Sequence, residues 1–322
     1  MSISYLIHYG FTYKLAPMKR YLILITIGVM LRVEGQQIGN PLDGIEIGRL
    51  EYGYISGIGD VQIERKGIGF NFGKPLKKGQ SGIGVGYNNF HLTFKDASEF
   101  NNFSSFDHIH NIRLSLFYRR PLKNNWSFSL GISPLISSTL NDNISGEDIV
   151  YTSFTSVSKR WLKDGNISVL NLGIGFGTLF GRPSVFPVIS YFKQVSEAFS
   201  YALGLPQTGA FFTLNDKNRI DITARPEGLF GNNATELAFD DGNATRINTK
   251  LQYNALRLNV TYNLKFGANW TTFFTAGYIP FSTLKVVDDD NNDLYDFNAD
   301  DSAFFNVGIR FNINRKSNES EK

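Results

Sequence analysis

The stretch 305–313, near the end of the chain, alternates strictly between two kinds of side chain. Apolar residues occupy the odd positions, and Asn, Gly and Arg residues occupy the even ones. Only a β-strand has a side-chain period of two, so this stretch predicts a strand with one apolar and one polar face. A sheet of such strands has one face that must avoid water.

The same alternation recurs along the chain and predicts fourteen strands. They are 45–56, 61–73, 81–94, 112–119, 126–133, 149–161, 170–176, 184–193, 198–205, 209–215, 219–224, 256–264, 269–279 and 303–313. Most have about the 9–11 residues that a tilted strand needs to cross a bilayer. The fold class that this pattern predicts is all-β, a single transmembrane antiparallel β-barrel of about fourteen strands. Twelve strands is the alternative if 198–215 is irregular.

The connections between these strands alternate in length. Short polar turns follow the even strands, for example Lys74–Gln80, whereas Lys95–Asp107, Ile136–Asp148, Pro226–Thr249 and Ile279–Ser302 are long. Outer-membrane barrels have short periplasmic turns and long external loops. An even number of strands then places both termini in the periplasm.

Composition helps to choose between a membrane barrel and a soluble sandwich, which also alternates. Only 19% of the 322 residues are charged, against about 25% in a soluble protein. The net charge of +3 gives no indication of nucleic-acid binding. The chain has no cysteine, which excludes disulfides and thiolate chemistry. We expect the membrane barrel and keep a secreted sandwich or soluble barrel as the alternative.

The N-terminal region has the features of an export signal. Basic residues at Lys19 and Arg20 precede an apolar run, 21–31, and small residues near Gly35 suit a cleavage site. We therefore expect residues 1–35 to be an extension with a cleaved signal peptide, and residues 36–322 to be the outer-membrane barrel.

Several short motifs carry a family resemblance. They are Pro187-Val-Ile-Ser-Tyr-Phe-Lys-Gln, Tyr201-Ala-Leu-Gly-Leu-Pro206, Ala224-Arg-Pro-Glu-Gly228 and Gly231-Asn-Asn. With them the chain resembles an uncharacterised outer-membrane β-barrel family of Bacteroidota, a domain of unknown function. The resemblance implies a fold and a location, but no substrate and no catalytic residues.

Charged residues on the polar faces are the first candidate site. We expect five charged residues to line the lumen: Arg113, Arg219, Asp221, Arg257 and Arg310. Glu64 joins them if the register assumed for its strand is right. Unpaired charge in a low-dielectric tube is costly. The charges either pair across the lumen and hold its shape, which we favour, or leave a row of Arg that selects anions.

An acidic loop is the second candidate. Asp288, Asp290 and Asn292 have the 1, 3, 5 spacing of a calcium loop, and Asp293 follows where the expected Gly would be. An EF-hand is not supported, but a looser external Ca²⁺ site involving these four residues is possible. No other cofactor is expected.

Histidines are the third candidate. His108 and His110, with Asp107, could ligate zinc or copper, although exposed loop histidines are the simpler interpretation. Ser104 and Ser105 lie nearby, but the spacing matches no hydrolase signature, so we do not expect an enzyme.

The leading functional hypothesis is a pore or transporter for small solutes, based on the polar, small-residue face of many strands. The alternatives are a non-conducting barrel whose external loops bind at the envelope surface and, less favoured, a lipid-modifying enzyme. The expected partners are outer-membrane lipid and lipopolysaccharide, the barrel-assembly machinery and small solutes. No nucleic-acid partner is expected.

Overall fold

The computed structural model describes residues 45–95, 103–238 and 245–313. All of them belong to one compact unit, Val33–Lys322. The expected export segment, residues 1–35, lies outside the described residues.

The regular secondary structure of the described residues consists of β-strands and two single-turn 3₁₀ helices. In chain order the elements are β1 (Ile45–Ile58), β2 (Val61–Leu76), β3 (Gly79–Phe94), η1 (Phe103–Phe106), β4 (His108–Pro121), β5 (Trp126–Ser138), η2 (Gly146–Asp148), β6 (Ile149–Lys163), β7 (Asn166–Gly177), β8 (Ser184–Gln194), β9 (Phe199–Leu205), β10 (Thr208–Thr213), β11 (Asn218–Asn233), β12 (Leu237–Ala238), β13 (Thr245–Arg246), β14 (Thr249–Phe266), β15 (Trp270–Val287), β16 (Asp293–Asp296) and β17 (Ser302–Ile313). Neither helix in the described residues has the length and hydropathy of a membrane span.

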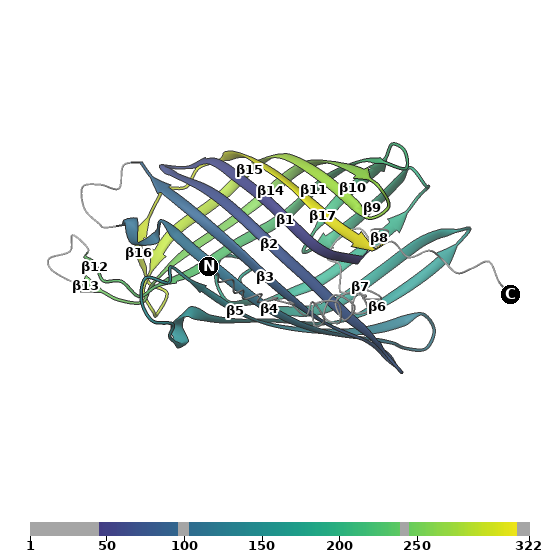
Figure 1. Ribbon diagram of the computed structural model, residues 1–322, viewed down its shortest axis with the longest axis horizontal. Helices are drawn as coiled ribbons and strands as arrows, with labels where there is room; N and C mark the ends of the chain where they lie inside the picture. Colours follow the sequence, from purple (N-terminus) through teal and green to yellow (C-terminus); the bar gives the residue numbers. More distant parts are fainter. Residues whose placement is uncertain (1–44, 96–102, 239–244, 314–322) are drawn as a thin grey trace, which may run out of the picture. The chain divides into compact units, whose positions relative to one another are not determined.

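Fourteen of these strands form a closed antiparallel barrel (Figure 1). Consecutive strands pair from β1 to β11, β11 pairs with β14, β14 with β15, β15 with β17, and β17 returns to β1. β16 pairs only with β15, and β12 with β13 forms a separate hairpin. The predicted fourteen-strand barrel is confirmed, and 198–215 contributes the two short strands β9 and β10.

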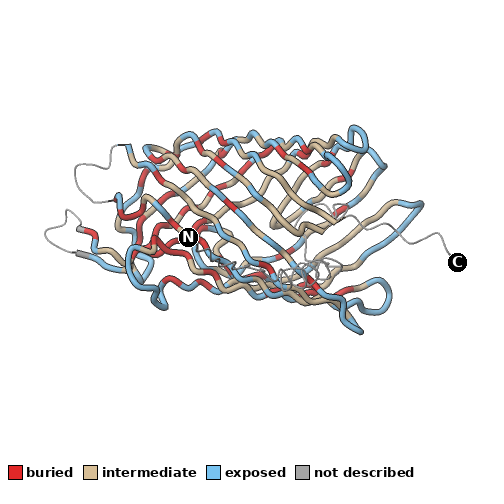
Figure 2. Tube along the Cα trace, viewed as in Figure 1, coloured by how far each residue is buried: buried red, intermediate tan, exposed pale blue. Residues whose placement is uncertain are grey.

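The outer face of the barrel is apolar. On β3, Ile83, Val85 and Tyr87 are 38–49% exposed, and on β14, Leu258 and Val260 are 41% and 51% exposed. Side chains of the opposite parity are mostly buried or intermediate, as the alternating colours of Figure 2 illustrate. A closed barrel leaves no unpaired strand edge, so its exterior suits hydrocarbon, where every backbone polar group must be paired.

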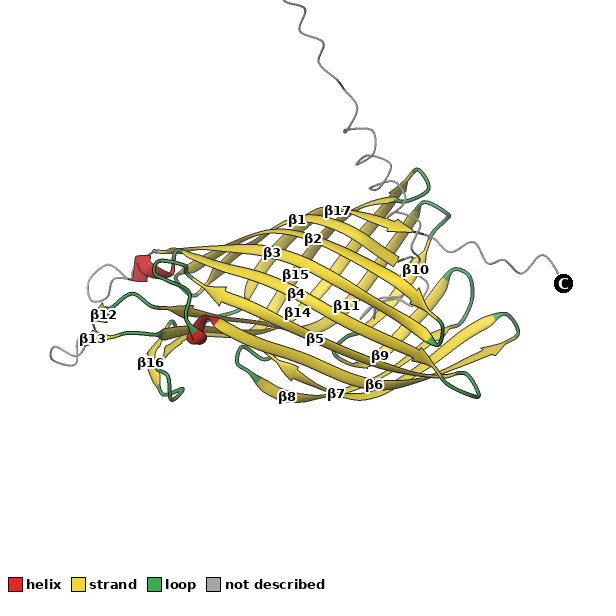
Figure 3. Ribbon diagram, turned by 60° about the horizontal axis from the view of Figure 1, so that its bottom comes forward, coloured by secondary structure: helices red, strands yellow, loops and turns green. Residues whose placement is uncertain are grey.

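The two ends of the barrel differ. Short turns join β2 to β3, β4 to β5 and β14 to β15 at one end, where the described chain also begins and ends, with Ile45 paired to Ile313. The other end carries the long connections with η1, the β12–β13 hairpin and β16 (Figures 1 and 3). The predicted contrast between the two ends is present, although only residues 59–60 join β1 to β2 and only residues 206–207 join β9 to β10 on the long-loop side.

The strands differ in length, so fewer of them reach the long-loop end, and the barrel is narrower there. β14 and β15 have 18 residues each, whereas β9 has 7 and β10 has 6. β11 pairs with β14 along its whole length but with β10 only up to Ala224. Pro226 comes two residues later, where the strand has become an edge and its missing N–H is tolerated.

Beyond Pro226, β11 crosses to the far wall and meets β5. Asn232 and Ser138 are parallel partners, the Thr139 amide donates to the Asn232 carbonyl at 2.9 Å, and the Ser137 hydroxyl donates to the Phe230 carbonyl. Nine of the described strands, β1 to β5, β17, β15, β14 and β11, therefore enclose the long-loop end. All fourteen enclose the remainder.

Candidate functional site

An apolar cluster fills the nine-strand end of the barrel. Closed barrels of about eight strands have an interior just wide enough to be filled by side chains. Eighteen buried residues from both walls, η1 and the long loops meet there: Ile55, Ile58, Val61, Ile63, Leu92, Phe103, Phe106, Ile109, Leu229, Leu237, Leu251, Tyr253, Ala255, Ile279, Leu284, Val286, Phe297 and Phe304. This end of the lumen is a packed protein core.

Next to the apolar cluster lies an ion network that spans the lumen. Arg65 on β2 contacts Glu51 on β1 at 2.7 Å and Glu227 on β11 at 3.3 Å, and Arg257 on β14 contacts Glu227 at 2.5 Å. β2 and β11 are not neighbours, because β1, β17, β15 and β14 separate them around the ring. The Arg65–Glu227 pair therefore joins opposite walls.

Further contacts fix the arginines of this network. The guanidinium of Arg257 lies 3.6 Å from the centre of the Phe304 ring. Arg49 contacts Glu46 at 2.8 Å and Glu51 at 3.5 Å, and the Asn306 amide donates to Glu51. A delocalised guanidinium suits such sites, since it stacks on a ring while its N–H groups remain paired with carboxylates.

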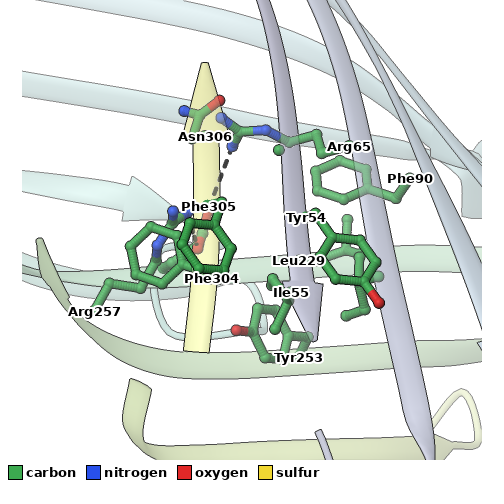
Figure 4. A pocket seen from close by; sticks show the side chains of 14 residues that line it. Tyr54, Ile55, Arg65, Phe90, Leu229, Tyr253, Arg257, Phe304, Phe305 and Asn306 are labelled. Carbon is green, nitrogen blue, oxygen red and sulfur yellow. Dashed lines mark hydrogen bonds and ion pairs between the residues drawn. The ribbon is translucent and has the colours of Figure 1, made fainter. Parts of the chain in front are cut away.

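A small cavity lies between the ion network and the apolar cluster (Figure 4). Its volume is about 30 Å³, and its wall includes Arg65, Arg257, Tyr253 and Phe304. A single water needs about 10–15 Å³ by this measure, whereas small-molecule pockets measure about 300–1,000 Å³. The cavity has room for one or two waters but not for a solute.

Four of the five charged residues predicted for the lumen are engaged in pairs. Arg257 belongs to the ion network, as described. Arg219 contacts Asp221 at 2.7 Å, Asn263 donates to Asp221 at 2.9 Å, and Arg310 donates to Asn263. These contacts form a second group, on β11, β14 and β17. The fifth residue, Arg113, has the inward parity of Ile109 and Asn111, but its side chain is exposed.

The prediction for Glu64 was wrong. Glu64 is the partner of Tyr54, on the outward face, and Arg65 is the partner of Gly53, on the inward face. The apolar residues Val61 and Ile63 share the inward parity and are buried in the apolar cluster. We had assumed that apolar residues face outward. Near the long-loop end of β2 this assumption assigned the inward and outward positions the wrong way round.

The central residues of the ion network, Glu51, Arg65 and Glu227, were missed. Their strands were identified, but only the barrel closure brings β1, β2 and β11 together. One signal was available for Glu227, because it lies two residues from Arg225 in a motif that the resemblance had already singled out.

The predicted calcium residues lie at and after the end of β15. The Asp288 carboxylate accepts hydrogen bonds from the backbone amides of Asp290 and Asn292, at 3.0 and 2.8 Å, and from the Asn292 side chain. Asp293 contacts Lys285 at 2.5 Å. Within the described ranges no group of three or more His, Asp or Glu is arranged to hold a metal ion. Calcium binding in this loop stays a prediction.

Comparisons with known proteins give a family and a set of distant barrels. Residues 75–320 match the family described as Domain of unknown function (DUF6268), which confirms the resemblance to a family of that kind. No curated protein matches.

Three solved structures are among those matched. The NanC porin is 9% identical, with 83% of this chain and 100% of that one covered and a TM-score of 0.38. LpxR from Salmonella typhimurium is 9% identical, with 82% and 100% covered and a TM-score of 0.39. The TodX monoaromatic hydrocarbon channel is 9% identical, with 87% and 94% covered and a TM-score of 0.39. Similarity this low carries no argument about function.

Proposed function

We propose that this chain, which belongs to the family Domain of unknown function (DUF6268), is a non-conducting outer-membrane barrel that acts at the envelope through its long-loop end. The outer-membrane location is supported by the closed fourteen-strand ring and its apolar exterior. The Bacteroidota source, the periplasmic position of both termini and contact with lipopolysaccharide and the assembly machinery stay predictions.

The observation that carries this proposal is the apolar cluster in the lumen. Full burial of a Val, Leu, Ile or Phe side chain contributes about 1.5–3 kcal/mol. Hydrating six of the eighteen residues would cost about 9–18 kcal/mol at that rate. Minor conformations that proteins visit readily lie only a few kcal/mol above the ground state. An ion path through this end is therefore too costly to open spontaneously.

The pore hypothesis, which the sequence favoured, needs a path that avoids the apolar cluster. The exposed side chain of Arg113 supports it, since that side chain lies on the lumen wall and is accessible. A solute route would have to pass the wall by Arg113 and leave between the long connections. It is the second candidate, and the same measurement tests both.

The test is planar-bilayer conductance of the refolded chain. We expect no stepwise current above background. The matched variant is Arg113→Glu, which reverses one accessible charge on the lumen wall. A wild-type current whose ion selectivity shifts in Arg113→Glu would overturn the non-conducting proposal and support a small-solute pore. A current with the same selectivity in both proteins would also overturn the non-conducting proposal, and would mean that Arg113 does not set the selectivity of the path.

A further inference from the structure

The three histidines in the described part of the chain gather on one patch of the barrel exterior. The sequence has four histidines, of which three follow residue 35: His91, His108 and His110. His91 lies on β3, and the other two lie at the start of β4. His91 and His108 are direct partners in the antiparallel pairing, so their side chains leave the same face of the sheet.

That face is the outer one, towards the long-loop end. Ile109 and Asn111, of the opposite parity on β4, are buried inside the barrel, whereas His108 is exposed. On β3 the same outer row continues through Tyr87 to Val85 and Ile83, which belong to the apolar exterior. The histidines therefore lie just beyond the apolar belt, where water and dissolved ions have access.

The distance between the first two rings suits a shared metal ion. The ring centres of His91 and His108 are 4.6 Å apart, with the planes 13° from parallel. Zinc binds imidazole nitrogen at about 2.0–2.1 Å, which places the centres of two rings on one tetrahedral ion about 5 Å apart. The two rings are stacked, whereas a shared ion must lie in the plane of each ring, so binding requires both side chains to turn until one nitrogen of each faces the ion. His108 is exposed and His91 is partly exposed, and accessible side chains change rotamer readily.

His110 is held differently. Its Nδ1 is 2.9 Å from the Tyr87 hydroxyl and 3.3 Å from the Asn89 amide nitrogen. Its ring centre is 6.2 Å from that of His108. Among the described residues no set of three metal-binding side chains is recognised. His110 therefore serves as the neighbouring histidine against which the other two can be tested.

We propose that His91 and His108 form a two-imidazole site for a divalent transition metal ion, Cu²⁺ or Zn²⁺, with water as the remaining ligands. Imidazole is a preferred ligand of both ions, and Cu²⁺ binds most tightly among the first-row divalent ions. The bound ion links β3 to β4 at the long-loop end. The inference is independent of whether the barrel conducts.

The test is Cu²⁺ titration of the untagged chain refolded in detergent, followed by calorimetry and by electron paramagnetic resonance. We expect one site per chain with a nitrogen splitting pattern from two imidazoles. His91→Gln and His108→Gln should each weaken binding by at least about tenfold, which is about 1.4 kcal/mol. The matched control, His110→Gln, should keep both the affinity and the two-nitrogen pattern.

A second measurement guards against misfolded variants. Zn²⁺ should raise the Tm of the wild type and of His110→Gln, because an ion that binds only the folded state stabilises it, but not that of His91→Gln. Heat-dependent electrophoretic mobility reports whether each variant is folded. Absence of Cu²⁺ binding in the wild type, unchanged affinity in His91→Gln, or equal loss in His110→Gln would each overturn the two-histidine assignment.

Discussion

Five glycines on the inner face each lie opposite a phenylalanine of the neighbouring strand. The register pairs are Gly82 with Phe117, Gly131 with Phe154, Gly175 with Phe186, Gly277 with Phe304 and Gly308 with Phe273. Each phenyl ring lies over its glycine, and a Cβ there would come within 2.1–2.5 Å of a ring atom. An aromatic ring that covers a cross-strand glycine helps to pin the register. The inner face is thus less polar than the alternation alone suggested.

At one of these pairs we predict a loss of stability on adding a single methyl group. Gly131→Ala forces the Phe154 ring off its position, because the new Cβ would lie 2.1 Å from it. Overpacking of this kind costs about 1–3 kcal/mol. Urea unfolding in lipid vesicles measures the change. Gly146→Ala is the control, since no atom lies within 4 Å of its Cβ position, and an equal effect of both changes would contradict the packing argument.

Glu227 is the residue on which the ion network depends. Its side chain is 17% exposed and lies between Arg65 and Arg257. Glu227→Ala leaves two guanidinium groups in the lumen without their shared carboxylate, and removing one partner of a buried pair costs about 3–5 kcal/mol.

The same unfolding assay tests this expectation against a matched exposed carboxylate. Glu147 also contacts a cation, Lys250, but its side chain is 51% exposed. Exposed pairs contribute about 0–1 kcal/mol. A loss for Glu227→Ala no larger than that for Glu147→Ala would show that the ion network adds little to stability.

At the scale of elements, η2 is hydrogen-bonded to the end of β11 that crosses to β5. Ser145 and Asp148 form a capping box around this turn. The Asp148 carboxylate also accepts a hydrogen bond from the Asn232 side chain at 2.9 Å. Burial by itself raises the pKa of Asp148, but hydrogen bonds from Ser138, Asn232 and Ser145 outweigh it and hold the pKa below its usual value of 3.8.

This shift predicts a pH dependence of stability. The folded-state pKa of Asp148 lies below its unfolded value, so the stabilisation is present above the unfolded pKa and is lost as the pH falls through the folded one. Asp148→Asn should therefore lower the Tm at about pH 7 and have a smaller effect near pH 3. Thermal unfolding of both proteins across this range measures it, and a Tm difference independent of pH would contradict the assignment.

The residues predicted to bind calcium lie in the connection from β15 to β16 and at the start of β16. If this loop binds Ca²⁺, the ion must displace Lys285 from Asp293 and compete with the hydrogen bonds that Asp288 accepts. The hypothesis predicts a higher Tm with Ca²⁺ than with a chelator, and loss of that difference when Asp288, Asp290 and Asp293 are replaced by Asn. A wild-type Tm that is the same in both conditions would reject the site.

At the scale of the whole molecule, the barrel has two parts that differ in the number of strands around the lumen. Nine strands surround a packed core that behaves as a folded protein interior, while all fourteen strands enclose the remainder. The apolar exterior runs over both. We therefore predict that the refolded chain needs detergent or lipid to stay monomeric, which sedimentation can measure. A freely soluble monomer in buffer would contradict a membrane barrel.

Much of this architecture was predictable, because a strand's alternation is a local property. Each strand repeats its pattern every two residues wherever its partner lies, and turn lengths alternate with the parity of the strands. All fourteen barrel strands and the alternation of turns follow from that. Among the site residues, Arg219, Asp221, Arg257 and Arg310 were predicted by the same rule, since each occupies a polar position between apolar neighbours in the alternation.

The sequence by itself determined the number of strands and, along most of each strand, the face that suits hydrocarbon, because these depend on residues that are close along the chain. It did not determine the strand lengths, since 219–224 and 256–264 were predicted where β11 and β14 have 16 and 18 residues. Only the tertiary structure decided that β11 reaches β5 and closes one end, since this follows from unequal strand lengths summed around the ring. That closure places Val61 and Ile63 inside, where the same alternation indicated lipid, and brings Glu227 to Arg65 across the lumen. An apolar side chain avoids water equally well in a packed core or in a membrane, so its pattern alone cannot tell the two apart.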